Sequence, residues 1–173
     1  MLPLTAEGLL MIHALGAALG AAGVTFAELF YTQAVVDGKI DTCEKKHIEH
    51  TLWALQWGVS IMVLAGIGLI IVEYFLPYSE QTVLTAPFWM IHTLTVVVIV
   101  FGFLISRNLV PWWLGSAAAF SAWWMMLALH AWRTIPLGYV ALWLAYVLVT
   151  ALAICIFPYI RSFLIDRENR SRT

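Results

Sequence analysis

Residues 9–31 read LLMIHALGAALGAAGVTFAELFY, and this stretch decides the class of protein to which the chain belongs. His13 and Glu28 are its only side chains that carry or accept charge near neutral pH. An α-helix rises about 1.5 Å per residue, so roughly 20 apolar residues cross a hydrocarbon core about 30 Å thick. The stretch therefore predicts a helix that spans a lipid bilayer. Because Glu7 precedes it and no lysine or arginine does, we expect a retained helix and no secretion signal.

Four further apolar runs have the same length and character. Hydrophobic residues make up 62% of the chain and charged residues 11%, whereas soluble domains carry roughly 25% charged residues. Prolines stand at or near the starts of three runs, where a first helical turn tolerates them. We predict an all-α bundle that forms one transmembrane domain, residues 1–173, with spans at about 9–31, 51–75, 87–106, 111–132 and 137–159 and a cytoplasmic tail at about 160–173.

The basic residues predict an orientation. With five spans, eight of the nine lysines and arginines fall on one side of the membrane, and only Arg133 falls on the other. Cytoplasmic loops carry the excess of basic residues, so we expect the N-terminus outside and the C-terminus inside. The expected location is a bacterial inner membrane. The eight are Lys39, Lys45, Lys46, Arg107, Arg161, Arg167, Arg170 and Arg172.

This topology brings four polar residues from four spans to one level near the outer face. They are His13, Glu73, His92 and His130. Ionisable residues inside a bilayer are costly and usually face the bundle interior at a functional site. Alternatives remain open, because His130 and Glu73 lie close enough to the interface to be boundary residues. His13 and His92 could be structural residues held by hydrogen bonds.

Two kinds of cofactor suit this set of residues. A b-type haem would take His13 and His92 as axial ligands, with Arg133 near a propionate. His130 and Glu73 would be alternative ligands or would support the ligands from beside them. The small residues Gly16 and Gly20 would let a macrocycle approach, although such spacing also serves helix–helix contact. A single zinc, copper or iron ion could instead use His13, His92, His130 and Glu73.

A second polar group is expected at the cytoplasmic ends of spans one and three. Glu28 lies near the inner end of the first span, and Arg107 follows the third. The two could form an ion pair, or Glu28 could take up protons. Cys43 and Cys155 lie far apart and match no zinc or iron–sulfur spacing. No basic stretch suits nucleic acid.

Part of the chain is similar to a known family. An early histidine, a Gly/Ala-rich first helix, a charged loop and the segment Trp89-Met90-Ile91-His92-Thr93-Leu94-Thr95 resemble the small haem-associated membrane proteins of the HemJ and CopD kind. HemJ proteins include bacterial protoporphyrinogen oxidases, and CopD proteins are linked to copper handling. The resemblance covers roughly spans one to three and implies haem binding with His13 as a ligand. A lysine follows the span-three tryptophan in HemJ, and Thr93 stands at that position here, so the oxidase activity is not implied.

The sequence therefore predicts a b-type haem-binding membrane protein, with oxidoreductase activity as one form of that function. Electrons would pass between the quinone pool or a partner protein and the outer side. A metal-ion-dependent membrane enzyme or transporter that uses the same histidines is the second hypothesis. A non-catalytic accessory subunit of a larger membrane complex is the third. No residue is identified as catalytic.

Overall fold

The computed structural model describes residues 4–37, 42–75, 81–132 and 135–171. Every element in this part of the chain is helical, and no strand occurs in it. Five of the helices are long and apolar enough to cross a membrane, which confirms the predicted all-α bundle with five spanning helices. The elements are α1 (Leu4–Asp37), α2 (Thr42–Phe75), the 3-10 helix η1 (Thr82–Leu84), α3 (Ala86–Ser106), α4 (Trp112–Ala131) and α5 (Tyr139–Ser171).

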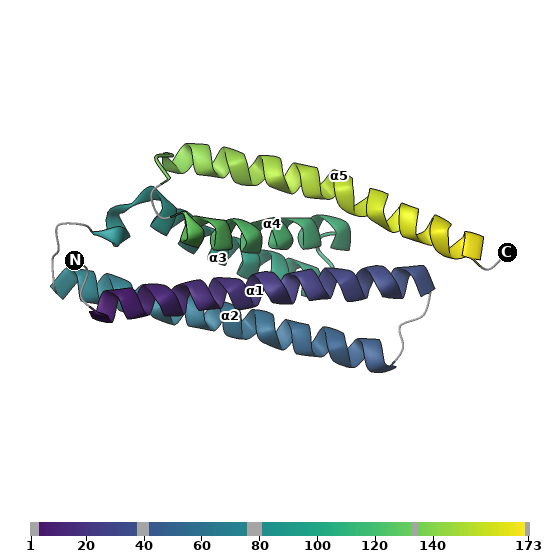
Figure 1. Ribbon diagram of the computed structural model, residues 1–173, viewed down its shortest axis with the longest axis horizontal. Coiled ribbons are helices and arrows are strands. Elements are labelled where there is room, and N and C mark those ends of the chain that lie inside the picture. Colours follow the sequence, from purple (N-terminus) through teal and green to yellow (C-terminus); the bar gives the residue numbers. More distant parts are fainter. Residues whose placement is uncertain (1–3, 38–41, 76–80, 133–134, 172–173) are drawn as a thin grey trace.

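Successive long helices run antiparallel, so α1 starts and α5 ends at opposite ends of the bundle (Figure 1). We call the end at which α1 starts the histidine end. There α2 ends, α3 starts, α4 ends and α5 starts. Three helices are longer than the predicted spans. Helix α2 starts at Thr42, before the expected span at about 51–75. Helix α1 starts at Leu4, and α5 continues past Pro158 to Ser171, where a tail was expected. Hydropathy reports the membrane-crossing part of a helix, whereas the helix itself can continue into water.

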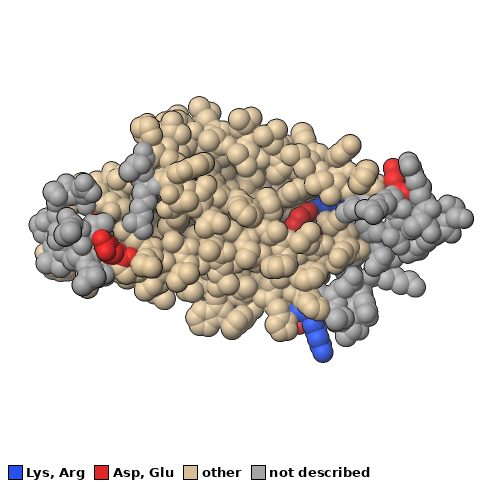
Figure 2. Space-filling model, in the orientation of Figure 1, with Lys and Arg blue, Asp and Glu red and all other residues tan. Residues whose placement is uncertain are grey.

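The surface is that of a protein surrounded by lipid. Large apolar side chains such as Leu64, Val140 and Leu144 are exposed on several helices. Figure 2 shows the described charged side chains toward the two ends of the visible face, with a broad uncharged band between them. In water this band would be a very large exposed apolar patch, but in a bilayer it contacts acyl chains.

Helices α1 and α2 approach each other closely because glycines face across their contact. A Cβ atom on Gly16 would lie 3.0 Å from the carbonyl oxygen of Gly58. A Cβ atom on Gly20 would lie 2.1–2.3 Å from ring carbons of Trp123 on α4. The small-residue face of α1 therefore serves helix contact, which was one of the two roles predicted for it, and it also seats a tryptophan.

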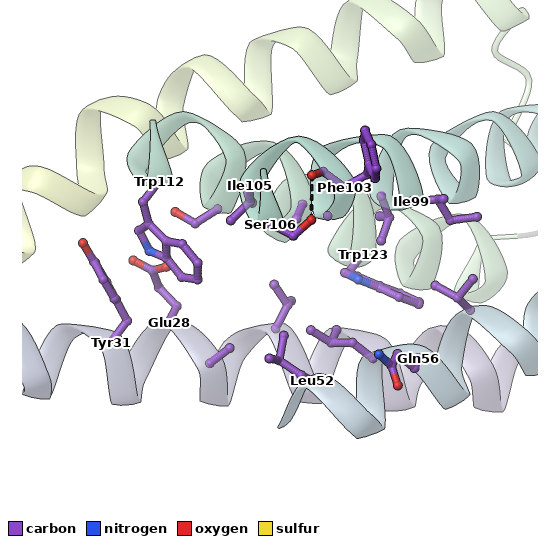
Figure 3. A pocket seen from close by; sticks show the side chains of 18 of the residues that line it. Glu28, Tyr31, Leu52, Gln56, Ile99, Phe103, Ile105, Ser106, Trp112 and Trp123 are labelled. Atoms are coloured by element: carbon purple, nitrogen blue, oxygen red, sulfur yellow. Dashed lines mark hydrogen bonds between the residues drawn. The ribbon is translucent and has the colours of Figure 1, made fainter. Parts of the chain in front are cut away.

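Packing is incomplete between the α1–α2 pair and the α3–α4 pair in the half of the bundle away from the histidine end. A pocket of about 750 Å³ lies there (Figure 3).

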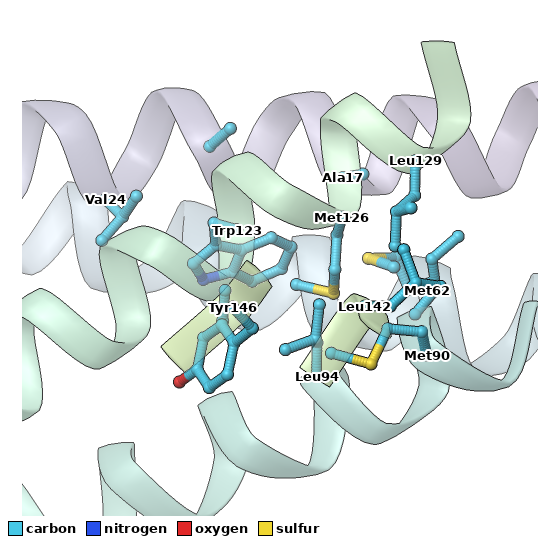
Figure 4. Packing of buried hydrophobic residues seen from close by; sticks show 13 residues of the cluster. Ala17, Val24, Met62, Met90, Leu94, Trp123, Met126, Leu129, Leu142 and Tyr146 are labelled. Atoms are coloured by element: carbon cyan, nitrogen blue, oxygen red, sulfur yellow. The ribbon is translucent and has the colours of Figure 1, made fainter. Parts of the chain in front are cut away.

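A cluster of buried apolar side chains lies between this pocket and the histidine end. Trp123 is fully buried, and Met126, Leu94, Met90 and Leu142 pack into the same cluster from three helices (Figure 4). Close packing of this kind fixes each helix about its own axis. It thereby determines which side chains of α1, α3 and α4 meet at the histidine end.

Candidate functional site

Three of the predicted histidines meet at the histidine end. His13 lies on α1, His92 on α3 and His130 in the last turn of α4. Helix α4 runs antiparallel to α1 and α3, which brings its end to the level of their first turns. The His13 side chain is 2% exposed, so it lies inside the bundle and not against lipid. These three residues are called the histidine cluster below.

His13 and His130 form a direct hydrogen bond. Nδ1 of His13 lies 2.7 Å from Nε2 of His130, and Nδ1 of His130 lies 2.7 Å from the Met126 carbonyl oxygen. A carbonyl oxygen can only accept, so Nδ1 of His130 carries a hydrogen and donates it. In a neutral His130 ring Nε2 is then an acceptor, and Nδ1 of His13 donates to it. Nε2 of a neutral His13 then carries no hydrogen.

The tautomer of His92 is fixed in the same way, by a carbonyl oxygen of its own helix. Its Nδ1 lies 2.9 Å from the Phe88 carbonyl oxygen and therefore donates to it. The other nitrogen, Nε2, is buried and has no hydrogen-bond partner in the described part of the chain. A buried lone pair without a donor costs free energy, on the order of 1–3 kcal/mol. Nε2 of His92 is therefore the least satisfied polar atom of the cluster.

Both second nitrogens face one point on α2. A Cβ atom on Gly66 would lie 2.2 Å from Nε2 of His92 and 3.4 Å from Nε2 of His13. Only glycine leaves room for the two rings here. The His13 ring also faces the backbone of Met62, one helical turn before Gly66. Helix α2 thus contributes backbone and space to the cluster.

The rings are packed against one another and against an aromatic neighbour. The centroids of the His13 and His92 rings are 5.4 Å apart with 21° between their planes, and those of His13 and His130 are 4.8 Å apart. The Phe88 ring lies 4.2 Å from His92. This packing shields the nitrogens from lipid and water and limits the size of anything that binds them.

Glu73, the fourth residue predicted at this level, is engaged elsewhere. Its carboxylate is buried and accepts hydrogen bonds from the backbone N–H groups of Thr82 (3.2 Å) and Val83 (2.9 Å). It thereby fixes η1 to the end of α2. Arg133, predicted beside a haem propionate, lies outside the described residues.

The arrangement offers two imidazole nitrogens to an incoming ion. In the described residues, no group of three or more His, Cys, Asp or Glu side chains is placed to hold one metal ion. The four predicted metal ligands therefore do not form one group, because His130 turns Nε2 to His13 and Glu73 turns to the loop. A metal bound by His13 and His92 would have two ligands from the described part of the chain.

A haem would need more space between the two rings than this packing shows. Two axial imidazoles must lie on opposite faces of a wide flat ring. Here the His13 and His92 rings stack face to face, and their Nε2 atoms abut the α2 backbone at Gly66. A macrocycle could enter between them only if α2 moved away. The predicted haem stays a prediction.

Glu28 is paired, but with a partner other than Arg107. Its carboxylate forms an ion pair with Arg161 of α5, whose guanidinium also lies 4.7 Å from the centre of the Tyr31 ring. Arg107 is exposed at the end of α3 and lies over the Phe103 ring. From the sequence, Arg161 was expected in the cytoplasmic tail. Because α5 continues as a helix through this position, Arg161 remains packed against α1.

Two further contributors were not predicted. Gly66 was not predicted as a site residue, because a glycine in an apolar helix can have many structural roles. Gly66 follows Gly58 by eight residues on the same helix, and this spacing was the sequence feature that could have drawn attention to it. Arg161 could have been found only by extending the last helix beyond its apolar run, which ends at about residue 159. No family model, curated protein or solved structure shows significant similarity to this chain.

Proposed function

We propose that this chain is a membrane redox protein that binds one transition-metal ion through Nε2 of His13 and Nε2 of His92. The observation that carries the proposal is the buried, unpartnered Nε2 of His92, directed at the same point as Nε2 of His13. Imidazole nitrogens suit copper, zinc and iron, and copper binds most tightly to such ligands. A redox role favours copper or iron.

The surroundings of the two nitrogens resemble those of metal ligands. A ligating histidine almost always donates its other N–H group to a carbonyl oxygen, carboxylate or water, which fixes the tautomer and the ring orientation. His92 donates to the Phe88 carbonyl oxygen, and His13 donates to His130. His130 thereby acts as a positioning residue. Its place at the end of α4 also links the buried ring of His13 to the membrane surface.

Protons compete with the metal for this site. Only the neutral imidazole binds a metal, so metal binding releases any proton from Nε2. The Met62 backbone beside His13 provides an acceptor for such a proton when the metal is absent. The electron partner would be a quinone or a partner protein. The excess of basic residues expected at the opposite end supports a histidine end on the outer side of a bacterial inner membrane.

Metal content and optical spectrum test the proposal together. The purified protein, reconstituted in nanodiscs, should bind one equivalent of Cu(I), Zn(II) or Fe(II), and His13→Ala and His92→Ala should each lose it. His50→Ala is the matched control, because His50 is exposed on α2 and bonds its own helix backbone. Equal metal binding in all variants would overturn the proposal. A Soret band lost in both cluster variants would identify haem as the occupant instead.

A further inference from the structure

The pocket of about 750 Å³ is separate from the histidine cluster (Figure 3). Its walls come from α1, α2, α3 and α4, and no histidine lines it. Its volume lies within the range of about 300–1,000 Å³ that is usual for small-molecule sites. Its lining is mainly apolar with a few polar groups, which is also typical of such sites. We call it the lateral pocket.

The lateral pocket opens sideways into the membrane between α2 and α3. Its lining residues on these helices, such as Gln56, Gly102 and Phe103, are exposed. Its lining residues on the far side, Val24 and Trp123, are buried. The mouth therefore faces the hydrocarbon region, and a ligand would reach it by diffusing within the bilayer.

Gln56 places an amide at this mouth. The spanning part of α2 starts at Glu49, so Gln56 lies about 10 Å further along the helix at 1.5 Å per residue. A polar side chain exposed to acyl chains is costly and usually marks a functional position. The amide can both donate and accept hydrogen bonds. A bound molecule with a polar group would remove the cost of exposing it to lipid.

The back wall on α4 carries three polar atoms that need partners. Nε1 of Trp112, Oγ of Ser116 and Nε1 of Trp123 are buried and have no hydrogen-bond partner in the described part of the chain. All three residues line the pocket on one face of α4. Indole N–H groups can only donate. The wall is therefore short of acceptors, and an acyl chain would supply none.

The end of the pocket away from the histidine cluster is closed by charged and aromatic groups. Figure 3 shows Glu28, Tyr31 and Trp112 together at that end, with Trp123 and Gln56 toward the other. Glu28 is held there by its ion pair with Arg161. The pocket is thus closed at its end and open at its side.

We propose that the lateral pocket binds a quinone dissolved in the membrane. A quinone combines a flat ring carrying carbonyl acceptors with an apolar isoprenoid tail. The carbonyls would meet the donors of Gln56 and the α4 wall, and the tail would leave through the α2–α3 mouth. A phospholipid keeps its polar groups at the interface, so its chains would leave these donors without acceptors.

Gly102 allows a direct test, because it lines the pocket and a Cβ atom there would meet nothing within 4 Å. Leucine at this position should fill the mouth without displacing a neighbour. Metal-free protein in quinone-free phosphatidylcholine nanodiscs is titrated with decylubiquinone, and saturable quenching of tryptophan fluorescence is measured against empty nanodiscs. Gly102→Leu should weaken binding at least tenfold. Gly138→Leu is the matched control, since Gly138 is equally open but lies outside the pocket.

Gln56→Leu supplies a second variant that retains a side chain of similar size. It should weaken decylubiquinone binding several-fold while leaving metal binding at the histidine cluster unchanged. Absence of saturable binding in the wild-type protein, or equal binding in Gly102→Leu, would overturn the proposal. Retention of phospholipid that decylubiquinone does not displace would overturn it too. Because the assay uses metal-free protein, a lack of quinone binding would not count against the proposed metal site.

Discussion

Nδ1 of His13 and Nε2 of His130 are 2.7 Å apart, so the ring at the end of α4 orients the ring that α1 brings into the bundle. His130 in turn is fixed by the Met126 carbonyl oxygen. A relay of this kind gives His13 one tautomer and one direction. It separates the role of His130 from that of the two proposed ligands.

The first prediction follows from this relay. His130→Ala should lower metal affinity by about 10–100-fold without abolishing binding, which is the usual effect of losing a group that orients a ligand. Metal titration of the reconstituted variant measures it, beside His50→Ala as the control. A loss as complete as that of His13→Ala would instead make His130 a ligand, and an unchanged affinity would remove it from the site.

The second prediction concerns the space at Gly66. A Cβ atom there would lie 2.2 Å from Nε2 of His92, and the His92 ring cannot turn away without losing its bond to the Phe88 carbonyl oxygen. Gly66→Ala should therefore abolish metal binding and destabilise the bundle by about 1–3 kcal/mol, as overpacking does. Metal content and thermal unfolding in detergent provide the two readouts.

Gly102→Ala is the matched control, because its added Cβ would meet nothing within 4 Å in the middle of α3. It should leave metal binding intact and raise stability by up to about 1 kcal/mol through helix propensity. If Gly66→Ala behaved in the same way, the close approach of His92 to α2 would be contradicted.

Hydropathy could predict the five spans because it reports which residues lie in lipid. It also gave the common depth of His13, His92 and His130, since depth follows from position within a span. Hydropathy does not predict how each helix is rotated about its axis, because that rotation depends on packing such as that of Trp123 against Gly20. For that reason the turn of Glu73 toward η1 could not be predicted. The partner of Glu28 also depended on the continuation of α5 beyond the end of its apolar run at about residue 159.

The third prediction tests that packing directly. Gly20→Ala should destabilise the protein by about 1–3 kcal/mol, because the rigid Trp123 ring cannot yield to a Cβ atom at 2.1–2.3 Å. Gly8→Ala on the same helix should have little effect, since its Cβ would meet nothing within 4 Å. In a double-mutant cycle, Trp123→Leu should cost less in the Gly20→Ala background than in the wild type. Thermal unfolding measures all four proteins, and additive effects would contradict the contact.

The fourth prediction distinguishes Arg107, the expected partner of Glu28, from Arg161, which forms the ion pair. The side chains of Glu28 and Arg161 are each only 13% exposed, so removal of one leaves the other charge poorly solvated. Arg161→Met should therefore lower the free energy of unfolding by about 3 kcal/mol, the usual cost of breaking a buried pair. Arg107→Met should change it by less than about 0.5 kcal/mol, as surface substitutions do.

The double variant Glu28→Gln/Arg161→Met completes this test. Removing both charges should restore much of the stability that Arg161→Met loses, because an uncompensated charge costs more than the loss of the pair. Unfolding in mixed detergent micelles gives the three free energies. If Arg107→Met were the destabilising variant and Arg161→Met were neutral, α5 would not contact α1 at this level. The closed end of the lateral pocket would then be lost, whereas the histidine cluster would be unaffected, because α5 contributes none of its residues.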